Sequence, residues 1–89
     1  MDIEYDPRKA ASNLKKHGVS FDGAVTALFD PMALAREDDD AQGEARFVAV
    51  GQSSTRHLIT VCYTLRKQEI IRLISARKAS TNERRQYES

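Results

Sequence analysis

The sequence predicts an α+β fold in which helices pack on one side of a mostly antiparallel β-sheet. Three strand-like segments fill most of the second half of the chain, and short polar turns separate them. Turns of this length join antiparallel neighbours, because a parallel crossover needs a dozen or more residues. Two capped helical segments precede these strands and a capping box follows them. The predicted order of elements is therefore β-α-α-β-β-β-β-α.

The first elements are a short strand and a polar helix. Ile3-Glu4-Tyr5 alternates in polarity and predicts the strand. Asp6-Pro7 then supplies an N-cap residue and a proline suited to the first helical position. We expect the helix to end at Lys16 or His17, just before Gly18, with its cations at the negative end of the helix dipole.

A second helix is predicted over residues 21–29, with Ser20 as its cap. Asp30-Pro31 ends this helix, and residues 32–36 predict a short strand. Helical spacing gives the helix an apolar stripe that should face the core, made of Phe21, Ala24, Val25, Leu28 and Phe29.

The second half of the chain contains the predicted meander over residues 46–51, 57–65 and 70–76. Its turns are Gln52-Ser53-Ser54-Thr55 and Arg66-Lys67-Gln68. Ser80-Thr81-Asn82-Glu83 fits a capping box and should open a short helix that continues through Tyr87.

Length and composition indicate one globular domain over residues 1–89, since 40% of the residues are hydrophobic and 30% are charged. No apolar run approaches the roughly 20 residues that span a bilayer, and no signal-peptide pattern is present, so we expect a cytoplasmic protein without a membrane partner. The lone Cys62 excludes an intrachain disulfide framework and is expected to be a buried core thiol rather than a nucleophile.

Charge is distributed unevenly along the chain. Residues 1–45 carry five Lys/Arg and ten Asp/Glu, a charge of −5, whereas residues 46–89 carry nine and three, a charge of +6. The basic half favours an anionic ligand, most often nucleic acid, unless the two halves interleave in space and neutralise each other. Both interpretations stay open at this point.

An acidic run occupies residues 37–43, and two interpretations of it can be weighed. Asp38, Asp39 and Asp40 could form a metal site, but consecutive carboxylates on a loop diverge, so a solvated turn is the expectation. Two histidines and one cysteine are too few for a structural zinc site unless carboxylates join them. The sequence therefore predicts neither a metal nor a cofactor.

The residues that could carry chemistry lie around the last strand and the final helix: Arg72, Arg77, Lys78, Arg84, Arg85 and Tyr87. Alternation places Arg72 on one face with Ile70 and Ile74, and Arg77 on the other face. A structural interpretation pairs Arg77 with Glu83 or Glu88 and makes Tyr87 an aromatic residue at the edge of the core.

The same residues would also suit RNA cleavage without a metal. In that reaction the ribose 2′-OH attacks the adjacent phosphorus, and arginines stabilise the extra negative charge of the transition state. Arginine itself cannot act as the base. Candidates for the base are His17, His57, a lysine, a carboxylate or a tyrosinate, and His17 is attractive because imidazoles titrate near neutral pH. The alternative for His17 is a plain helix-terminal residue.

Several motifs follow one another in order along almost the whole chain. They are Tyr5-Asp6-Pro7, Asn13, Lys16-His17-Gly18, Phe21, Ala24, Phe29-Asp30-Pro31, Gly43-Glu44-Ala45-Arg46, Val48-Ala49-Val50-Gly51, Val61-Cys62-Tyr63-Thr64, Arg72-Leu73-Ile74-Ser75-Ala76-Arg77-Lys78-Ala79, Glu83 and Tyr87. With these motifs the chain resembles the BrnT family of type II toxins, whose fold is similar to that of the RelE ribonucleases. The loop Gln52-Ser53-Ser54-Thr55 departs from the resemblance by being more polar.

This resemblance implies a cytoplasmic endoribonuclease toxin that inhibits translation and arrests growth. Its implied partner is an antitoxin with a ribbon-helix-helix DNA-binding domain, so that operator DNA is contacted only through the antitoxin. A toxin homodimer within a heterotetramer is also implied.

The positions carried over as catalytic are Lys16, His17, Arg46, Arg72, Arg77 and Tyr87, and we add Lys15, Lys78 and Arg84 as RNA-binding residues. In our assignment of roles, His17 or Lys16 is the base, the arginines bind phosphate and the transition state, and Tyr87 stacks or transfers a proton. Because a sheet has two faces, some of these residues should be structural, Arg72 first among them.

Two other functions compete with the enzyme. A catalytically inactive toxin-like module could serve only to bind the antitoxin in operon autoregulation, with its basic residues forming the interface. A DNA-binding domain is weaker, since the sequence lacks helix-turn-helix spacing and a helix with a continuous basic face.

Overall fold

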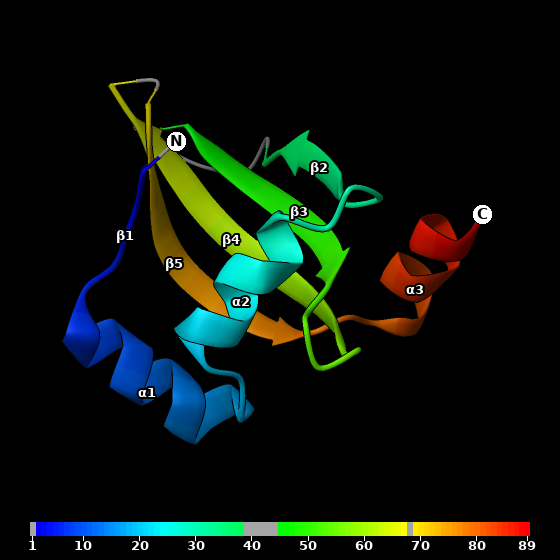
Figure 1. Ribbon diagram of the computed structural model, residues 1–89, viewed down its shortest axis with the longest axis horizontal. Coiled ribbons are helices and arrows are strands. Elements are labelled where there is room, and N and C mark those ends of the chain that lie inside the picture. Colours follow the sequence, from blue (N-terminus) through cyan, green and yellow to red (C-terminus); the bar gives the residue numbers. More distant parts are fainter. Residues whose placement is uncertain (1, 39–44, 68) are drawn as a thin grey trace.

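The computed structural model describes residues 2–38, 45–67 and 69–89, and Figure 1 shows their arrangement. The elements are β1 (Asp2–Glu4), α1 (Pro7–His17), α2 (Phe21–Leu28), β2 (Leu34–Glu37), β3 (Arg46–Gln52), β4 (Leu58–Arg66), β5 (Ile70–Lys78) and α3 (Thr81–Glu88). This order confirms the predicted one. The acidic segment proposed as a turn falls mainly on residues 39–44, which lie outside the described residues, as do Asp39 and Asp40 of the alternative metal site.

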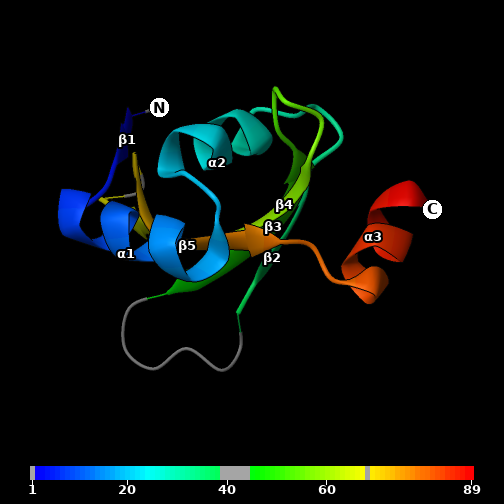
Figure 2. The same ribbon diagram turned by 90° about the horizontal axis from the view of Figure 1, so that it is seen from below.

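The five strands form one sheet in the order β1-β5-β4-β3-β2. β1 pairs with β5 in parallel, and the other three pairings are antiparallel. α1 and α2 cover one face of the sheet, as Figure 2 shows when the molecule is turned by 90°. The core lies between this face and the two helices, and its most deeply buried residues are Phe21, Ala24, Ala27, Val61, Leu73 and Ala76.

Local signals in the sequence explain the two N-terminal helices. The Asp6 carboxylate accepts a hydrogen bond from the backbone N–H of Arg8 (2.8 Å), and Gly18 ends α1 in the left-handed conformation with φ of 70°. Ser20 caps α2. Phe29 lies just after the end of α2 and is 68% exposed, so its predicted place in the core stripe is wrong.

A β-bulge in β5 changes which residues share a face. Cys62 of β4 pairs with Ser75, whereas the next residue, Tyr63, pairs with Leu73, so Ile74 is the extra residue in β5. The alternation therefore restarts, and Leu73 and Ala76 both point into the core. Arg72 and Arg77 consequently lie on the same face, opposite the helices. The prediction that they lie on different faces is wrong, because strict alternation ignores the extra residue.

The buried side chain of Asn13 connects α1 to β5 beside this bulge. Its Nδ2 atom donates to the carbonyl oxygens of Ala76 (2.8 Å) and Val19 (2.9 Å), and its Oδ1 atom accepts from the backbone N–H of Ala76 (3.0 Å). β1 pairs with β5 only along Ile70–Arg72, so the edge of β5 beyond that point is free to meet α1. The amide of Asn13 thus replaces a strand along this part of the edge.

α3 does not join the other two helices. It buries none of its residues, and it lies beyond the end of β5 beside β3 (Figure 1). The predicted capping box is present, with the side chains of Ser80 and Glu83 each bonded to the backbone N–H of the other. The expectation that all helices pack on one side is thus wrong for α3, which is polar and lacks an apolar stripe.

No helix among the described residues is long and apolar enough to cross a membrane.

Candidate functional site

The face of the sheet opposite α1 and α2 carries a concentration of arginines. We call it the open face. By strand register its side chains include Glu4 of β1, Leu34 and Arg36 of β2, Arg46, Val48 and Val50 of β3, Thr60, Cys62, Thr64 and Arg66 of β4, and Arg72, Ser75 and Arg77 of β5.

One row of the open face crosses four strands. Thr64 lies between Arg46 and Arg72 in register, and Glu4 is opposite Arg72 on β1. The Glu4 Oε1 atom accepts from Arg66 (2.6 Å) and from Arg72 (3.1 Å), and these bonds lower the pKa of its carboxyl group. Arg46 lies beside Asp38, whose backbone N–H donates to the Arg46 carbonyl oxygen (2.8 Å).

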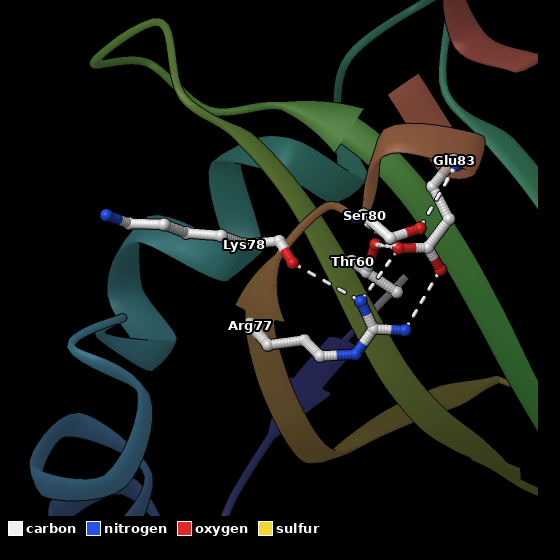
Figure 3. Close-up of polar contacts among 5 residues, drawn as sticks. All are labelled: Thr60, Arg77, Lys78, Ser80 and Glu83. Atoms are coloured by element: carbon white, nitrogen blue, oxygen red, sulfur yellow. Dashed lines mark hydrogen bonds and ion pairs between the residues drawn. The ribbon is translucent and has the colours of Figure 1, made fainter. Parts of the chain in front are cut away.

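The opposite end of the open face is tied to α3, as Figure 3 shows. Arg77 binds Glu83 through two hydrogen bonds (2.7 and 3.0 Å), and the Thr60 hydroxyl donates to the same carboxylate (2.9 Å). These contacts, led by the bond from Arg77, lower the Glu83 pKa from 4.5 to about 2. The predicted structural role of Arg77 as a partner of Glu83 is confirmed, whereas Glu88 contacts Arg84 instead (3.9 Å).

Cys62 lies on the open face between these two groups and not in the core, contrary to the prediction. It is half-buried, and burial raises the pKa of its thiol even though Arg46 and Arg77 act in the opposite sense. In register, Cys62 is paired with Ser75, and Arg46 and Arg77 lie opposite the residues two positions away from it on β4, Thr64 and Thr60. A raised pKa leaves less of the thiol as the nucleophilic thiolate near neutral pH.

Lys16 and His17 reach the site from its edge. They line a hollow of about 370 Å³ between α1 and β5, together with Arg8, Lys9, Ser12, Asn13, Ile74 and Ser75. Ser75 belongs both to this hollow and to the open face, so the hollow adjoins the central position. The bulge and the Asn13 bonds create this arrangement by bringing the end of α1 against β5.

The structure places the other predicted residues elsewhere. The Tyr87 hydroxyl donates to Asp30 (2.5 Å), and Tyr87 lines a separate hollow with Arg56 and Leu58. Lys78 lines a hollow on the helix side together with His57, whose Nδ1 atom is hydrogen bonded to Thr55 (3.0 Å). Lys15 is exposed on α1, and Arg84 is exposed on α3.

Three residues of this region were not identified from the sequence as parts of a site. Arg66 was assigned to a turn, although it is the last residue of β4 and holds Glu4. Thr64 shares one face of β4 with Cys62 and Arg66. Strand alternation predicts this shared face when the strand is taken to end at Arg66 and not at Leu65. The sequence shows Asn13 only as part of a motif. Its structural role is not predictable from neighbouring residues, because its partner Ala76 is 63 positions away.

The arrangement suits binding of an anion rather than of a metal ion. Within residues 2–38, 45–67 and 69–89, no group of His, Cys, Asp and Glu could hold a metal. Five arginines from four strands share the open face, and the carboxylates of Glu4 and Glu83 form ion pairs with three of them. Guanidinium groups of this kind bind phosphate through paired hydrogen bonds.

Comparisons with known proteins identify the family. A family model described as the ribonuclease toxin BrnT of type II toxin–antitoxin systems matches residues 5–83. Among solved structures, the chain is similar to the Brucella abortus ribonuclease toxin BrnT, with a TM-score of 0.66 and 26% sequence identity, covering 91% of this chain and 99% of that one. A search of curated proteins finds no match.

Proposed function

Because the chain belongs to the BrnT family of ribonuclease toxins of type II toxin–antitoxin systems, we propose that it cleaves RNA on the open face without a metal ion. Membership of the family confirms the resemblance found in the sequence. The observation that carries the proposal is the bulge in β5, because it places Arg72 and Arg77 on the same face as Arg46. Cleavage of cellular RNA would inhibit translation and arrest growth.

The scissile phosphate binds at the centre of the open face, above Cys62 and Ser75. Arg46 and Arg77 approach this position from β3 and β5 and stabilise the charge that develops as the 2′-OH attacks phosphorus. Arg77 brings a carboxylate partner, Glu83, with it.

Lys16 or His17 supplies the base that removes the 2′-OH proton. Both line the hollow that adjoins Ser75, so either can reach a ribose bound above the β5 edge. His57 is held on the helix side by Thr55 and does not share this hollow. Tyr87 has no part in the proposed chemistry, since its hydroxyl is bonded to Asp30 and not to the arginines of the open face.

The partner of a type II toxin is its antitoxin. We propose that this antitoxin carries a ribbon-helix-helix domain and brings the complex to operator DNA. The basic open face offers it a complementary surface, so binding there would block RNA access. A toxin dimer within a heterotetramer is the assembly we expect.

The test is cleavage of a single-stranded RNA by the antitoxin-free protein in EDTA, with Arg46→Ala, Arg77→Ala and the exposed control Arg85→Ala. We expect the wild type and Arg85→Ala to release 2′,3′-cyclic phosphate ends. Arg46→Ala should cleave about a hundredfold more slowly, as for loss of one transition-state donor. Circular dichroism checks that each variant is folded, since Arg77→Ala leaves Glu83 without its main partner.

Equal cleavage by all four proteins would contradict the site. Intact RNA with every folded protein, including on ribosomes, would favour the alternative of an inactive module that only binds the antitoxin.

A further inference from the structure

Thr64 carries an unexplained polar atom at the centre of the arginine row. Its side chain is 3% exposed, and its Oγ1 atom is the one buried side-chain nitrogen or oxygen without a hydrogen-bond partner among the described residues. A buried hydroxyl without a partner costs stability, so such atoms are rare in native proteins and often belong to functional sites. Thr60, on the same strand and face, shows the ordinary case, because its hydroxyl donates to Glu83.

The surroundings of Thr64 are strongly cationic. Arg46 and Arg72 lie directly opposite it on the neighbouring strands, and Arg66 follows two residues later on the same face of β4. Residues directly opposite in antiparallel strands have Cβ atoms about 5 Å apart, so these side chains surround the hydroxyl. Arg66 and Arg72 share one carboxylate, because a single Oε1 atom of Glu4 pairs with both of them. Positive charge remains in excess.

We propose that Thr64, Arg66 and Arg72 form a second phosphate subsite, in which the Thr64 hydroxyl donates to a phosphate oxygen of bound RNA. The inference rests on the proposed function and extends it along the strand. Cys62, below the scissile phosphate, and Thr64 are two residues apart on β4, a separation of roughly 7 Å. The subsite therefore holds a phosphate next to the one that is cleaved, and Arg46 lies directly opposite Thr64 on β3.

Glu4 occupies the arginines while the subsite is empty. Arg66 and Arg72 are partly exposed and flexible, so both can turn from the carboxylate towards a phosphate. This movement also makes the hydroxyl accessible, because the arginines are its neighbours on the open face. A phosphate then receives charge-assisted bonds from two guanidinium groups and one hydroxyl.

The test compares Thr64→Val, which removes the hydroxyl at nearly constant volume, with Thr64→Ser, which retains it. Thermal unfolding is measured without RNA, and binding of a 2′-O-methyl oligoribonucleotide is measured by fluorescence anisotropy. We expect Thr64→Val to raise the Tm by about 5 °C, because an unpaired buried hydroxyl is removed, and to weaken binding about tenfold. Thr64→Ser should keep wild-type affinity. Thr60→Val is the matched control and should lower the Tm, because it breaks the bond to Glu83.

The salt dependence of binding provides a readout that a structural role would not change. Arg66→Ala should reduce the slope of log K against log salt by about 0.7, the value for one phosphate contact on a single strand. Arg85→Ala should leave this slope unchanged.

A Thr64→Val protein that binds the oligonucleotide as tightly as the wild type would overturn the subsite, even if its Tm rises. Tight, hydroxyl-dependent binding by a wild type that leaves unmodified RNA intact would instead refute the nuclease proposal and retain the subsite. A wild type that does not bind the oligonucleotide would refute both.

Discussion

Replacing Asn13 by leucine tests the contact that creates the proposed site. Leucine has a similarly branched side chain and a better helix propensity, so the change keeps α1 favourable while removing the amide. Three hydrogen bonds are lost, and the N–H and C=O of Ala76 and the C=O of Val19 stay buried without partners. A buried unsatisfied group costs about 1–3 kcal/mol, so the free energy of unfolding should fall by about 3–5 kcal/mol after some relaxation.

A loss of this size is large for a chain of 89 residues. It corresponds to a decrease in Tm of at least about 12 °C, and part of the protein should be unfolded at physiological temperature. Urea unfolding followed by circular dichroism measures the change. Asn82→Leu, the same substitution at an exposed position of α3, is the control and should stay within about 0.5 kcal/mol of the wild type.

The reasoning also predicts a loss of activity beyond the loss of stability. Without Asn13 the bulge is no longer held against α1. The hollow between α1 and β5, which Lys16 and His17 line, then no longer meets the open face at Ser75. RNA cleavage per folded molecule should therefore fall when measured at low temperature. An Asn13→Leu protein within about 1 kcal/mol of the wild type would refute the account of β5.

Three further predictions follow from the geometry. Folding lowers the Glu83 pKa from 4.5 to about 2, so its bond to Arg77 stabilises the protein fully above pH 4.5 and is lost as the pH falls towards 2. The effect is at most about 3 kcal/mol, less solvent screening of a guanidinium that is 45% exposed. Glu83→Gln should flatten acid unfolding in this range, and an unchanged profile would contradict the pairing. Gly51→Ala should lower the free energy of unfolding by more than about 1 kcal/mol, because a Cβ atom there would lie 2.1 Å from a carbonyl oxygen of α2; wild-type stability in urea would show that the helix sits further from the sheet. Tyr87→Phe should cost about 1 kcal/mol through loss of its bond to Asp30 but leave RNA cleavage unchanged, whereas loss of cleavage would restore Tyr87 to the site, as the sequence-based hypothesis has it.

Local sequence signals predict the order and the ends of most helices and strands, because the same caps and turns are present in the structure. The caps at Asp6, Ser20 and Ser80 fix where each helix begins, and Gly18 fixes where α1 ends. Short polar turns between apolar segments give the antiparallel meander. These features depend on neighbours in the sequence, so no tertiary contact was needed to find them.

The composition of the open face could not be predicted, because it depends on one inserted residue. Ile74 is an apolar residue of a type common in strands, and its identity does not mark it as a bulge. The bulge is held by Asn13, which is distant in the sequence, and it reverses the side on which Arg77 lies. Cys62 was placed in the core for a related reason, since an apolar segment does not reveal which of its alternating positions faces the helices.

Phe29 illustrates a different limit. Its helical spacing from Phe21 and Val25 matches a core-facing stripe, but α2 ends one residue earlier and the chain turns away. The ring is therefore exposed. Periodicity predicts a face only where the helix continues.

The central claim is that RNA binds across the open face, and amide NMR of the antitoxin-free protein with a 2′-O-methyl oligoribonucleotide tests it most directly. The account predicts chemical-shift changes that concentrate at Arg46, Cys62, Thr64, Ser75 and Arg77 and extend to His17 at the end of α1. Changes confined to the helix-side hollow around His57 and Lys78 would contradict it.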